Sequence, residues 1–498
     1  MKINAKNTVI LLLALIMISF LYCTPMAATE PPISSIAASY DVDTVNISGT
    51  AKSGVLAVAV LIYDDDTLIC LKTTGVTSGA FNTDVTIALS PGAYTAKAAD
   101  YEGGAYTETT FTVASSYQAE VSGGGSLPVV VDDDTNSASI DLETISGNLT
   151  KGENTTVTFP SISGVKQFRA SLPASVLSGT ATGSFTINTG SGVMTIPGNM
   201  LSGMGLTGDS AITIGTAAQE GLPNDVRAAI GDRPLLRLTL TVDGEQTQWD
   251  HPGTPVTVSI PYQPTAEERN HPESIVIWYI DTNDTLICIP NGRYDADHGT
   301  VTFETCHFSL FAVGYHNVSF SDVLQKAWYY QAVSGIAARE ITSGTSKTTF
   351  HPDALITRGQ FITLLMRTYA IAEDENDSNN FADAGNTYYT GYLAAAKRLG
   401  IAKGVGNNLF APNQAISRQE IFTLLYRAIG ILGQPRDGDS GKTLDDFSDA
   451  ANVASWAKEA TAYLVETGAV AGYNGKLYPT VSATRAETAQ VLYRLIAQ

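Results

Sequence analysis

The chain has 498 residues, too many for one hydrophobic core, and its 44% hydrophobic content excludes an intrinsically disordered protein. Its formal net charge is −20, from 49 acidic and 29 basic residues, which excludes nucleic acid and anionic lipid as bulk partners because like charges repel. Abundant Gly (44) and Tyr (22) are common in β-rich extracellular proteins. We therefore expect about three domains, some of them rich in strands.

Residues 1–28 are predicted to be an export signal. Lys2 and Lys6 precede an apolar run at 9–22, which is shorter than the roughly 20 apolar residues that a membrane-spanning helix needs. Cys23 leaves a lipoprotein open as an alternative, although the bulky residues 20–22 make a poor lipidation site. Since no later segment is long and apolar enough to cross a bilayer, the mature protein is expected to lack a transmembrane segment.

Residues 30–116 are predicted to form a small all-β sandwich. Short alternating runs occur at 45–48, 56–63, 67–72, 85–89, 94–99 and 107–113, separated by turn clusters such as the acidic run 64–66. About six or seven strands in roughly 80 residues is typical of an immunoglobulin-like sandwich. The segment resembles bacterial immunoglobulin-like surface modules in size and rhythm, without a specific motif.

Residues 117–139 are predicted to be a flexible linker. Ser122–Ser126 reads Ser-Gly-Gly-Gly-Ser and is followed by three aspartates at 132–134. The apolar stretch 127–131 inside it is interpreted as an isolated strand or a spacer.

Residues 140–316 are predicted to be a second β-rich module. Strands are expected at 236–242, 256–260, 275–280, 286–289 and 301–305, with a short helix at 223–230. Once the signal is removed, Cys70, Cys288 and Cys306 remain. Cys288 and Cys306 could face each other across a hairpin centred on Asp297 and form a disulfide; the alternative is two reduced, buried thiols.

From Phe320 onward the pattern becomes helical, and three repeats are predicted at 317–376, 377–443 and 444–498. Each repeat opens with Phe-x-Asp and later carries an Arg that lies 38, 37 and 38 residues after the opening Phe. The aspartates are Asp322, Asp383 and Asp449, and the arginines are Arg358, Arg418 and Arg485. Aromatic–proline pairs at Phe350–Pro352, Phe410–Pro412 and Tyr478–Pro479 are expected to plug the loops between the helices.

A capping box is predicted in front of each second helix. The pairs are Thr357 and Gln360, Ser417 and Glu420, and Thr484 and Glu487. In such a box the cap hydroxyl accepts from the third helical amide, and the third side chain accepts from the cap amide.

The repeated arginine is the most informative feature. At the first helical position a cation opposes the helix macrodipole. Free amides and a guanidinium at a helix start suit a carboxylate or phosphate, so we predict an anion pocket beside the loop glycines Gly344, Gly404 and Gly472. The alternative is that each Arg pairs with an acid of a neighbouring repeat, for instance one of the three opening aspartates.

The repeats resemble S-layer homology (SLH) domains, whose signature Thr-Arg-Ala-Glu occurs unaltered at 484–487. About 90 residues before them resemble the β module that often precedes such repeats in Gram-positive surface proteins. The resemblance implies a pseudo-threefold helical trimer that binds secondary cell-wall polysaccharide in its grooves, often through a pyruvylated sugar. It implies anion contacts from the three arginines, with the opening aspartates and loop glycines shaping the grooves.

The motifs also depart from the family pattern. The first copy reads Thr-Arg-Gly-Gln, with Gly359 and Gln360, and the second has Gln419 in place of Ala. Unequal grooves are therefore expected. Trp328 and Trp456 are predicted as sugar contacts but ranked below the arginines. Aromatic residues at such positions, including Tyr388–Tyr389 of the second repeat, more often belong to a hydrophobic core than to a sugar-binding surface.

No catalytic or metal-binding pattern stands out. The six histidines are scattered, and neither Asp run has the spacing of a calcium loop. We therefore expect a multidomain protein without enzymatic activity, cofactor or metal, in which immunoglobulin-like and other β modules precede an all-α SLH trimer. We predict that it is exported, bound non-covalently to the cell wall, and carries the β modules as stalk or adhesin. A self-assembling surface-layer subunit and a wall-anchored polysaccharide-degrading enzyme remain alternatives.

Overall fold

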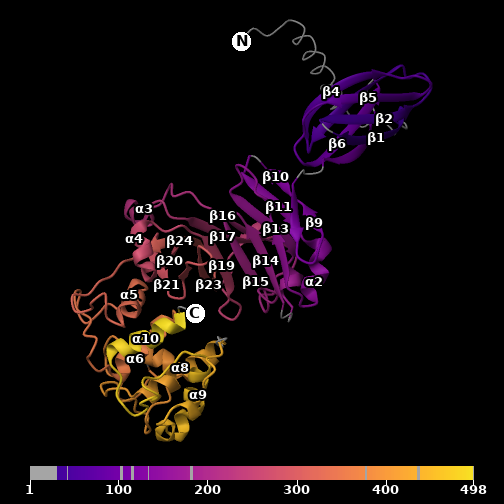
Figure 1. Ribbon diagram of the computed structural model, residues 1–498. Helices are drawn as coiled ribbons and strands as arrows, with labels where there is room; N and C mark the ends of the chain where they lie inside the picture. The colour runs from indigo at the N-terminus through magenta and orange to yellow at the C-terminus, as the bar shows by residue number, and fades with distance from the viewer. Residues whose placement is uncertain are drawn as a thin grey trace. The chain divides into compact units, whose positions relative to one another are not determined.

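A computed structural model describes residues 31–41, 43–100, 105–113, 117–132, 134–179, 183–375, 378–433 and 438–496. The predicted export signal lies outside these ranges. The N-terminal part is rich in strands and the C-terminal part is helical (Figure 1). Two compact units are present, the first reaching Ala119 and including Ser126–Ile140, the second comprising Glu120–Gly125 and the chain from Asp141.

Two antiparallel sheets share one core in the first unit. One sheet has the order β1 (Ile33–Asp41), β2 (Thr44–Ala51), β5 (Ala80–Thr86); the other has β4 (Thr67–Gly75), β3 (Ala57–Asp64), β6 (Gly92–Asp100), β7 (Thr107–Val113). Alternation buries one face of each sheet, as at Phe81, Thr83 and Val85 of β5. The acidic run 64–66 makes the β3–β4 turn, where Asp65 has φ of 47°.

The segment predicted as a flexible linker instead forms short strands. These are β8 (Gln118–Val121), β9 (Ser126–Pro128), β10 (Val130–Asp132) and β11 (Ser137–Asp141). Buried residues alternate through them at Ala119, Leu127, Val129, Ala138 and Ile140. The apolar pattern therefore outweighs the Gly-rich composition, and the three consecutive glycines are confined to the turn after β8.

The β-rich part of the second unit contains two further sheets. One runs β13 (Gln167–Pro173), β16 (Asp209–Thr216), β17 (Leu235–Val242), β24 (Leu310–Tyr315), β20 (Ile275–Ile280), β21 (Leu286–Ile289), with β18 (Glu245–Thr247) on β17. The other runs β22 (Arg293–Asp295), β23 (Thr300–Thr305), β19 (Val256–Pro261), β15 (Gly192–Pro197), β14 (Ser184–Thr189), β12 (Thr155–Thr158). Short helices are η1 (Glu143–Ile145), α2 (Ser146–Thr150), η2 (Ala174–Leu177), α3 (Asn224–Ile230), α4 (Ala266–Asn270) and η3 (Pro272–Ser274).

Cys288 and Cys306 do not form the disulfide considered from the sequence. The hairpin around Asp297 joins β22 to β23, with Asp295 opposite Thr300, whereas Cys288 lies on β21 of the other sheet opposite Trp278. Cys70, Cys288 and Cys306 are all free thiols. Burial raises the pKa of Cys288 to about 12.

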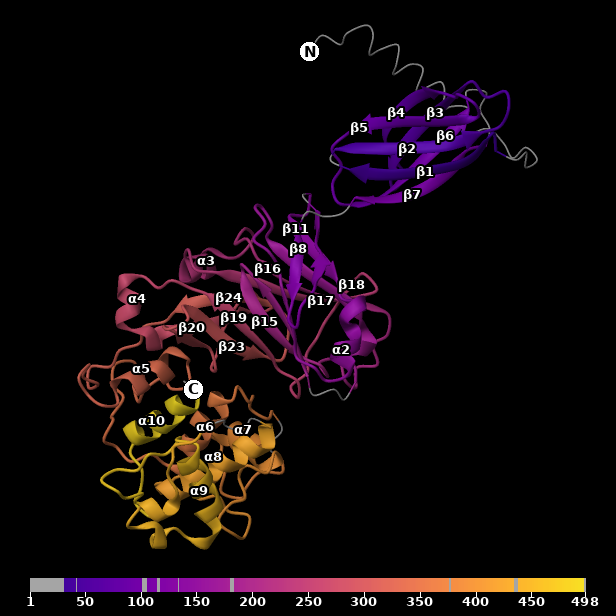
Figure 2. The same cartoon turned by 45° about the vertical axis from the view of Figure 1, so that its right-hand side comes forward.

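The helical part is built from three helix–loop–helix repeats around one core. The first has α5 (Tyr330–Ala338) and α6 (Arg358–Thr368), the second α7 (Thr390–Arg398) and α8 (Arg418–Leu432), and the third α9 (Lys458–Glu466) and α10 (Arg485–Ile496), with η4 (Leu444–Asp446), η5 (Ala450–Asn452) and η6 (Ser455–Ala457) before α9. The second helix of each repeat packs on the first helix of another: α6 on α7, α8 on α9, and α10 on α5. This cyclic order gathers the helices into one cluster (Figure 2).

Candidate functional site

Each second helix begins against the loop of another repeat, and we call these three junctions seams. At the α6 seam, the amides of Arg358 and Gly359 donate to the carbonyl oxygens of Gln414 (2.9 Å) and Pro412 (2.8 Å). The α8 and α10 seams repeat this, with Arg418 to Val481, Gln419 to Pro479, Arg485 to Ala354 and Ala486 to Pro352. The first two amides of each helix are therefore not free, and they join the repeats instead of forming the expected amide pocket.

The third amide is also engaged at the cap. Thr357 accepts from the Gln360 amide at 3.2 Å and donates its own amide to Gln360 Oε1 at 3.0 Å. Thr484 and Glu487 make the same pair of bonds at 3.2 and 2.8 Å. At the α8 seam the Ser417 amide and hydroxyl both donate to Glu420, at 2.8 and 2.6 Å. What remains for a ligand at these helix starts is the side chain of the arginine.

The three arginines share one orientation. Each donates from Nε to the carbonyl oxygen of the loop plug of the next repeat: Arg358 to Phe410 (2.8 Å), Arg418 to Leu477 (2.8 Å) and Arg485 to Phe350 (2.7 Å). The Arg358 and Arg485 guanidinium carbons lie 4.5 and 4.6 Å from the ring centres of Phe410 and Phe350. Burial lowers the pKa of all three arginines. The guanidinium plane is thus fixed before any ligand arrives.

Two of the three arginines form ion pairs across the seam. Arg358 Nη1 contacts Glu420, and Arg418 Nη1 lies 3.2 Å from Glu487 Oε1. The internal-pairing alternative therefore holds at these two seams, although the partner is the third residue of the next capping box and not an opening aspartate. The equivalent residue for Arg485 is Gln360, and among the described residues Arg485 has no carboxylate partner.

The opening aspartates hold the loop plugs. Asp322 accepts from the amides of Phe350 (2.8 Å) and His351 (2.7 Å). Asp383 does the same for Phe410 and Ala411, and Asp449 for Leu477 and Tyr478. The second residue bound by each aspartate has a left-handed backbone, with φ of 57° at His351, 57° at Ala411 and 52° at Tyr478. The two hydrogen bonds from each aspartate, which we call its clamp, therefore stabilise this conformation. In the third repeat the buried plug is Leu477, which corrects the expectation that Tyr478 fills this place.

The loop glycines have an equally local role. Gly344, Gly404 and Gly472 have φ of 78°, 75° and 65°. A Cβ at these positions would come within 2.6, 2.6 and 2.4 Å of the Cε1 atoms of Phe320, Phe381 and Phe447. They let each opening phenylalanine pack against its loop.

Three of the aromatic residues that the sequence analysis favoured as core residues are exposed. Trp328 is 63% exposed, Tyr388 58% and Trp456 54%, and each shortly precedes the first helix of its repeat. Tyr389 alone is buried, and it explains Gly359, where a Cβ would meet its ring at 2.9 Å. Gln419 is explained by its Oε1, which accepts from the amide of Ala454 at 3.0 Å.

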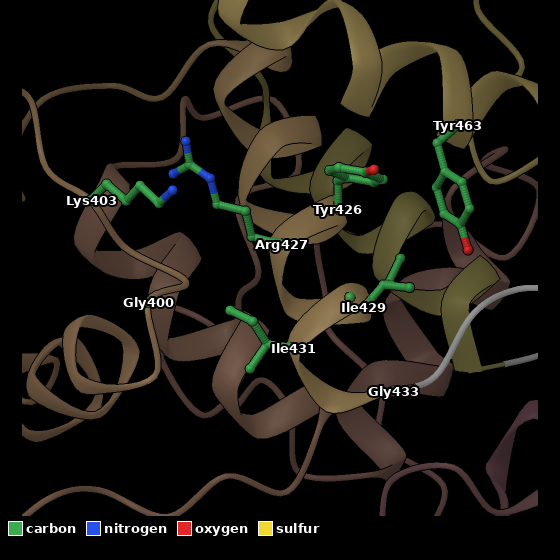
Figure 3. Close-up of a pocket in the computed structure, with 9 residues that line it drawn as sticks. Gly400, Lys403, Tyr426, Arg427, Ile429, Ile431, Gly433 and Tyr463 are labelled. Atoms are coloured by element: carbon green, nitrogen blue, oxygen red, sulfur yellow. The ribbon is translucent and has the colours of Figure 1, made fainter.

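A pocket of about 570 Å³ lies near the C-terminal end of α8, away from the helix start that carries Arg418. In Figure 3, Lys403 and Arg427 lie on one side of it and Tyr463 on the other. No sequence motif pointed to it. Throughout the described ranges, no group of three His, Cys, Asp or Glu side chains is arranged to hold a metal ion.

The S-layer homology domain model matches residues 319–362, 380–422 and 446–489. The chain is 30% identical over 245 residues to an amylopullulanase of Thermoanaerobacterium thermosulfurigenes, covering 48% of this chain and 13% of that protein. It is 30% identical to exoglucanase XynX of Acetivibrio thermocellus (36% of this chain, 16% of the relative) and 28% identical to the S-layer protein sap of Bacillus anthracis (35% and 21%). The chain thus spans about a fifth or less of these relatives.

The seams therefore lie within helical repeats that match the S-layer homology domain. This chain carries three S-layer homology domains, and together with the surface-layer relatives they support a cell-surface location. In the part of the chain that the structure describes, none of the helices has the length and apolar character needed to cross a bilayer.

Proposed function

We propose that this protein is held non-covalently on the cell wall by its three SLH domains, which bind secondary cell-wall polysaccharide bearing pyruvylated sugars. The domains form a pseudo-threefold trimer, and an immunoglobulin-like first module and the second β module project as stalk or adhesin. We propose no catalytic activity for it. The observation that carries the proposal is the arginine that recurs at every seam, fixed by its Nε bond.

The chemistry of the seam fits an acidic sugar. A guanidinium binds a carboxylate through two parallel hydrogen bonds, and a ketal-linked pyruvate offers one carboxylate on a neutral sugar ring. The exposed rings of Trp328, Tyr388 and Trp456 offer flat, amphipathic surfaces for that sugar. On a chain with net charge −20, fixed cationic positions are required to attract an acidic polymer.

Sedimentation with purified wall sacculi tests this function. The mature chain should sediment with intact sacculi, and sacculi stripped of their secondary polysaccharide should leave it in solution. Sacculi that keep the polymer but lose its pyruvate should bind at least tenfold less protein. Undiminished binding to polymer-free sacculi would overturn the anchoring function, and undiminished binding to pyruvate-free polymer would overturn the carboxylate assignment.

A surface-layer lattice subunit is the second candidate, because several relatives are S-layer proteins. Electron microscopy of the purified mature chain separates the two: ordered sheets indicate a lattice, and dispersed particles an isolated surface protein. Relatives named as an amylopullulanase, an exoglucanase and an endoglucanase keep the enzyme alternative testable, through release of reducing sugar from wall or storage polysaccharides.

A further inference from the structure

The three seams are built alike but are not equally charged. At the α6 seam the acids near Arg358 are Glu420 and Asp383, and at the α8 seam the acids near Arg418 are Glu487 and Asp449. At the α10 seam, the acid near Arg485 among the described residues is Asp322 alone. Asp322 already accepts two backbone amides, as the equivalent aspartates do, so the difference between the seams is the single glutamate that Gln360 replaces.

This difference decides which arginine can accept a ligand. A carboxylate approaching Arg358 or Arg418 must displace an intramolecular glutamate, and it would meet that glutamate's negative charge at close range. At Arg485 the neutral amide of Gln360 leaves the terminal nitrogens without a carboxylate. Arg485 is only 7% exposed, so its desolvation has already been incurred on folding, and its guanidinium gains most from a ligand carboxylate when no internal one is present.

The surroundings of Arg485 also provide a surface for the rest of the sugar. Burial raises the pKa of Tyr388, whose hydroxyl contacts the Gln360 side chain and which lies close enough to Arg485 to interact electrostatically. The residue is nevertheless 58% exposed. An exposed ring therefore adjoins the arginine that has no carboxylate partner in the described part of the chain.

We propose that the α10 seam, formed by Arg485, Gln360 and Tyr388, is the seam that takes the ligand carboxylate, and that Gln360 selects it by leaving Arg485 unpaired. This inference rests on the proposed function, since it names the groove in which the acidic sugar binds. In the α6 and α8 seams, the glutamate keeps the arginine in a structural ion pair.

The test is the substitution Gln360→Glu, assayed by sedimentation with pyruvate-bearing wall sacculi. Glu420 and Glu487 occupy the same capping position in the other repeats, so the substitution keeps the capping box and should leave the melting temperature unchanged or raise it. Because the new carboxylate pairs with Arg485, sacculus binding should fall at least tenfold. Wild-type affinity in a folded Gln360→Glu protein would overturn the inference.

Glu420→Gln is the matched control, because it makes the converse change at the α6 seam. It should keep at least wild-type binding, since it removes the carboxylate that pairs with Arg358 and lies in the cap of α8, outside the α10 seam. Loss of binding in this variant, with the fold retained, would contradict the inference, because it would show that an arginine paired with a glutamate takes part in ligand binding. If the wild-type chain itself fails to bind intact sacculi, the proposed function fails, which is distinct from a Gln360→Glu variant that binds normally.

Discussion

Arg339 donates from Nη2 to the carbonyl oxygen of Gly292 at 2.6 Å and thereby joins the first repeat to the second β module. The same side chain also donates to Glu273 (2.7 Å) and Ile275 (3.3 Å), and it is only 4% exposed. Its partners are backbone carbonyls, and Glu273 likewise accepts through its backbone carbonyl oxygen. Within this unit the repeats and the β module are therefore linked by a buried, charge-assisted network.

Replacing Arg339 by Met should lower the free energy of unfolding by about 3 kcal/mol or more, because several buried carbonyl oxygens lose their donor. Chemical denaturation of the mature chain measures this. The exposed Arg237 on β17 is the control, and Arg237→Met should change stability by less than about 0.5 kcal/mol. Equal effects of the two substitutions would show that the network contributes nothing specific.

The loop glycines give a prediction that separates a steric clash from backbone strain. Gly404→Ala should destabilise by about 2–4 kcal/mol, since its Cβ would lie 2.5 Å from the Leu409 oxygen and 2.6 Å from Phe381 Cε1. Gly406→Ala, with φ of 109° and open space around the Cβ, should cost only the strain, about 1–2 kcal/mol. Gly430→Ala, inside α8 and without close neighbours, should stabilise by up to about 1 kcal/mol.

The helix starts could be predicted from sequence because they depend on local chemistry. Thr357 and Gln360, three residues apart, identify a capping box without knowledge of any distant contact. The amides beside Arg358 could not be assigned in this way. Their acceptors are on Gln414 and Pro412, more than 50 residues away, and only the cyclic packing of the repeats brings them together.

Contacts between residues that are distant in sequence also explain the other differences between expectation and structure. From sequence, Gly359 only weakens the start of its helix. In the structure, the ring of Tyr389 from the next repeat occupies the space that a Cβ at position 359 would need. The pairing of Arg418 with Glu487 depends on a contact across 69 residues. The substitution of Gln for Glu at position 360 was visible in the sequence, but its electrostatic consequence falls on Arg485, which local reasoning does not connect to it.

The clamp on the first loop predicts a specific dependence on acid. Burial alone would raise the pKa of Asp322, but the amides of Phe350 and His351 outweigh it and hold the pKa below the usual value. Because the folded pKa is lower than the unfolded one, Asp322 contributes stability that is present above about pH 4 and lost as the pH falls through the folded pKa. Asp322→Asn should destabilise at pH 7 by about 1–2 kcal/mol and flatten stability between about pH 5 and pH 2.

Thermal unfolding over that pH range measures the effect. The exposed Asp353, which follows the same loop, gives the matched control, and Asp353→Asn should keep the wild-type pH profile. If Asp322→Asn retained the full acid dependence of the wild type, the carboxylate would not be the group that clamps the loop.

The Cys288 thiol provides a probe of unfolding in the second β module. Burial raises its pKa to about 12, so at pH 8 almost none of it is thiolate, the reactive form. Iodoacetamide should therefore label Cys288 at least about 10³-fold more slowly in the native chain than in urea, where the pKa returns to about 8.5. Peptide mass spectrometry follows each cysteine separately, and Cys70, which is less buried and lies near Lys72, should be labelled faster in the native protein. If Cys288 in the native protein were labelled as fast as Cys70, β21 would have to separate readily from β20, where Trp278 lies opposite Cys288.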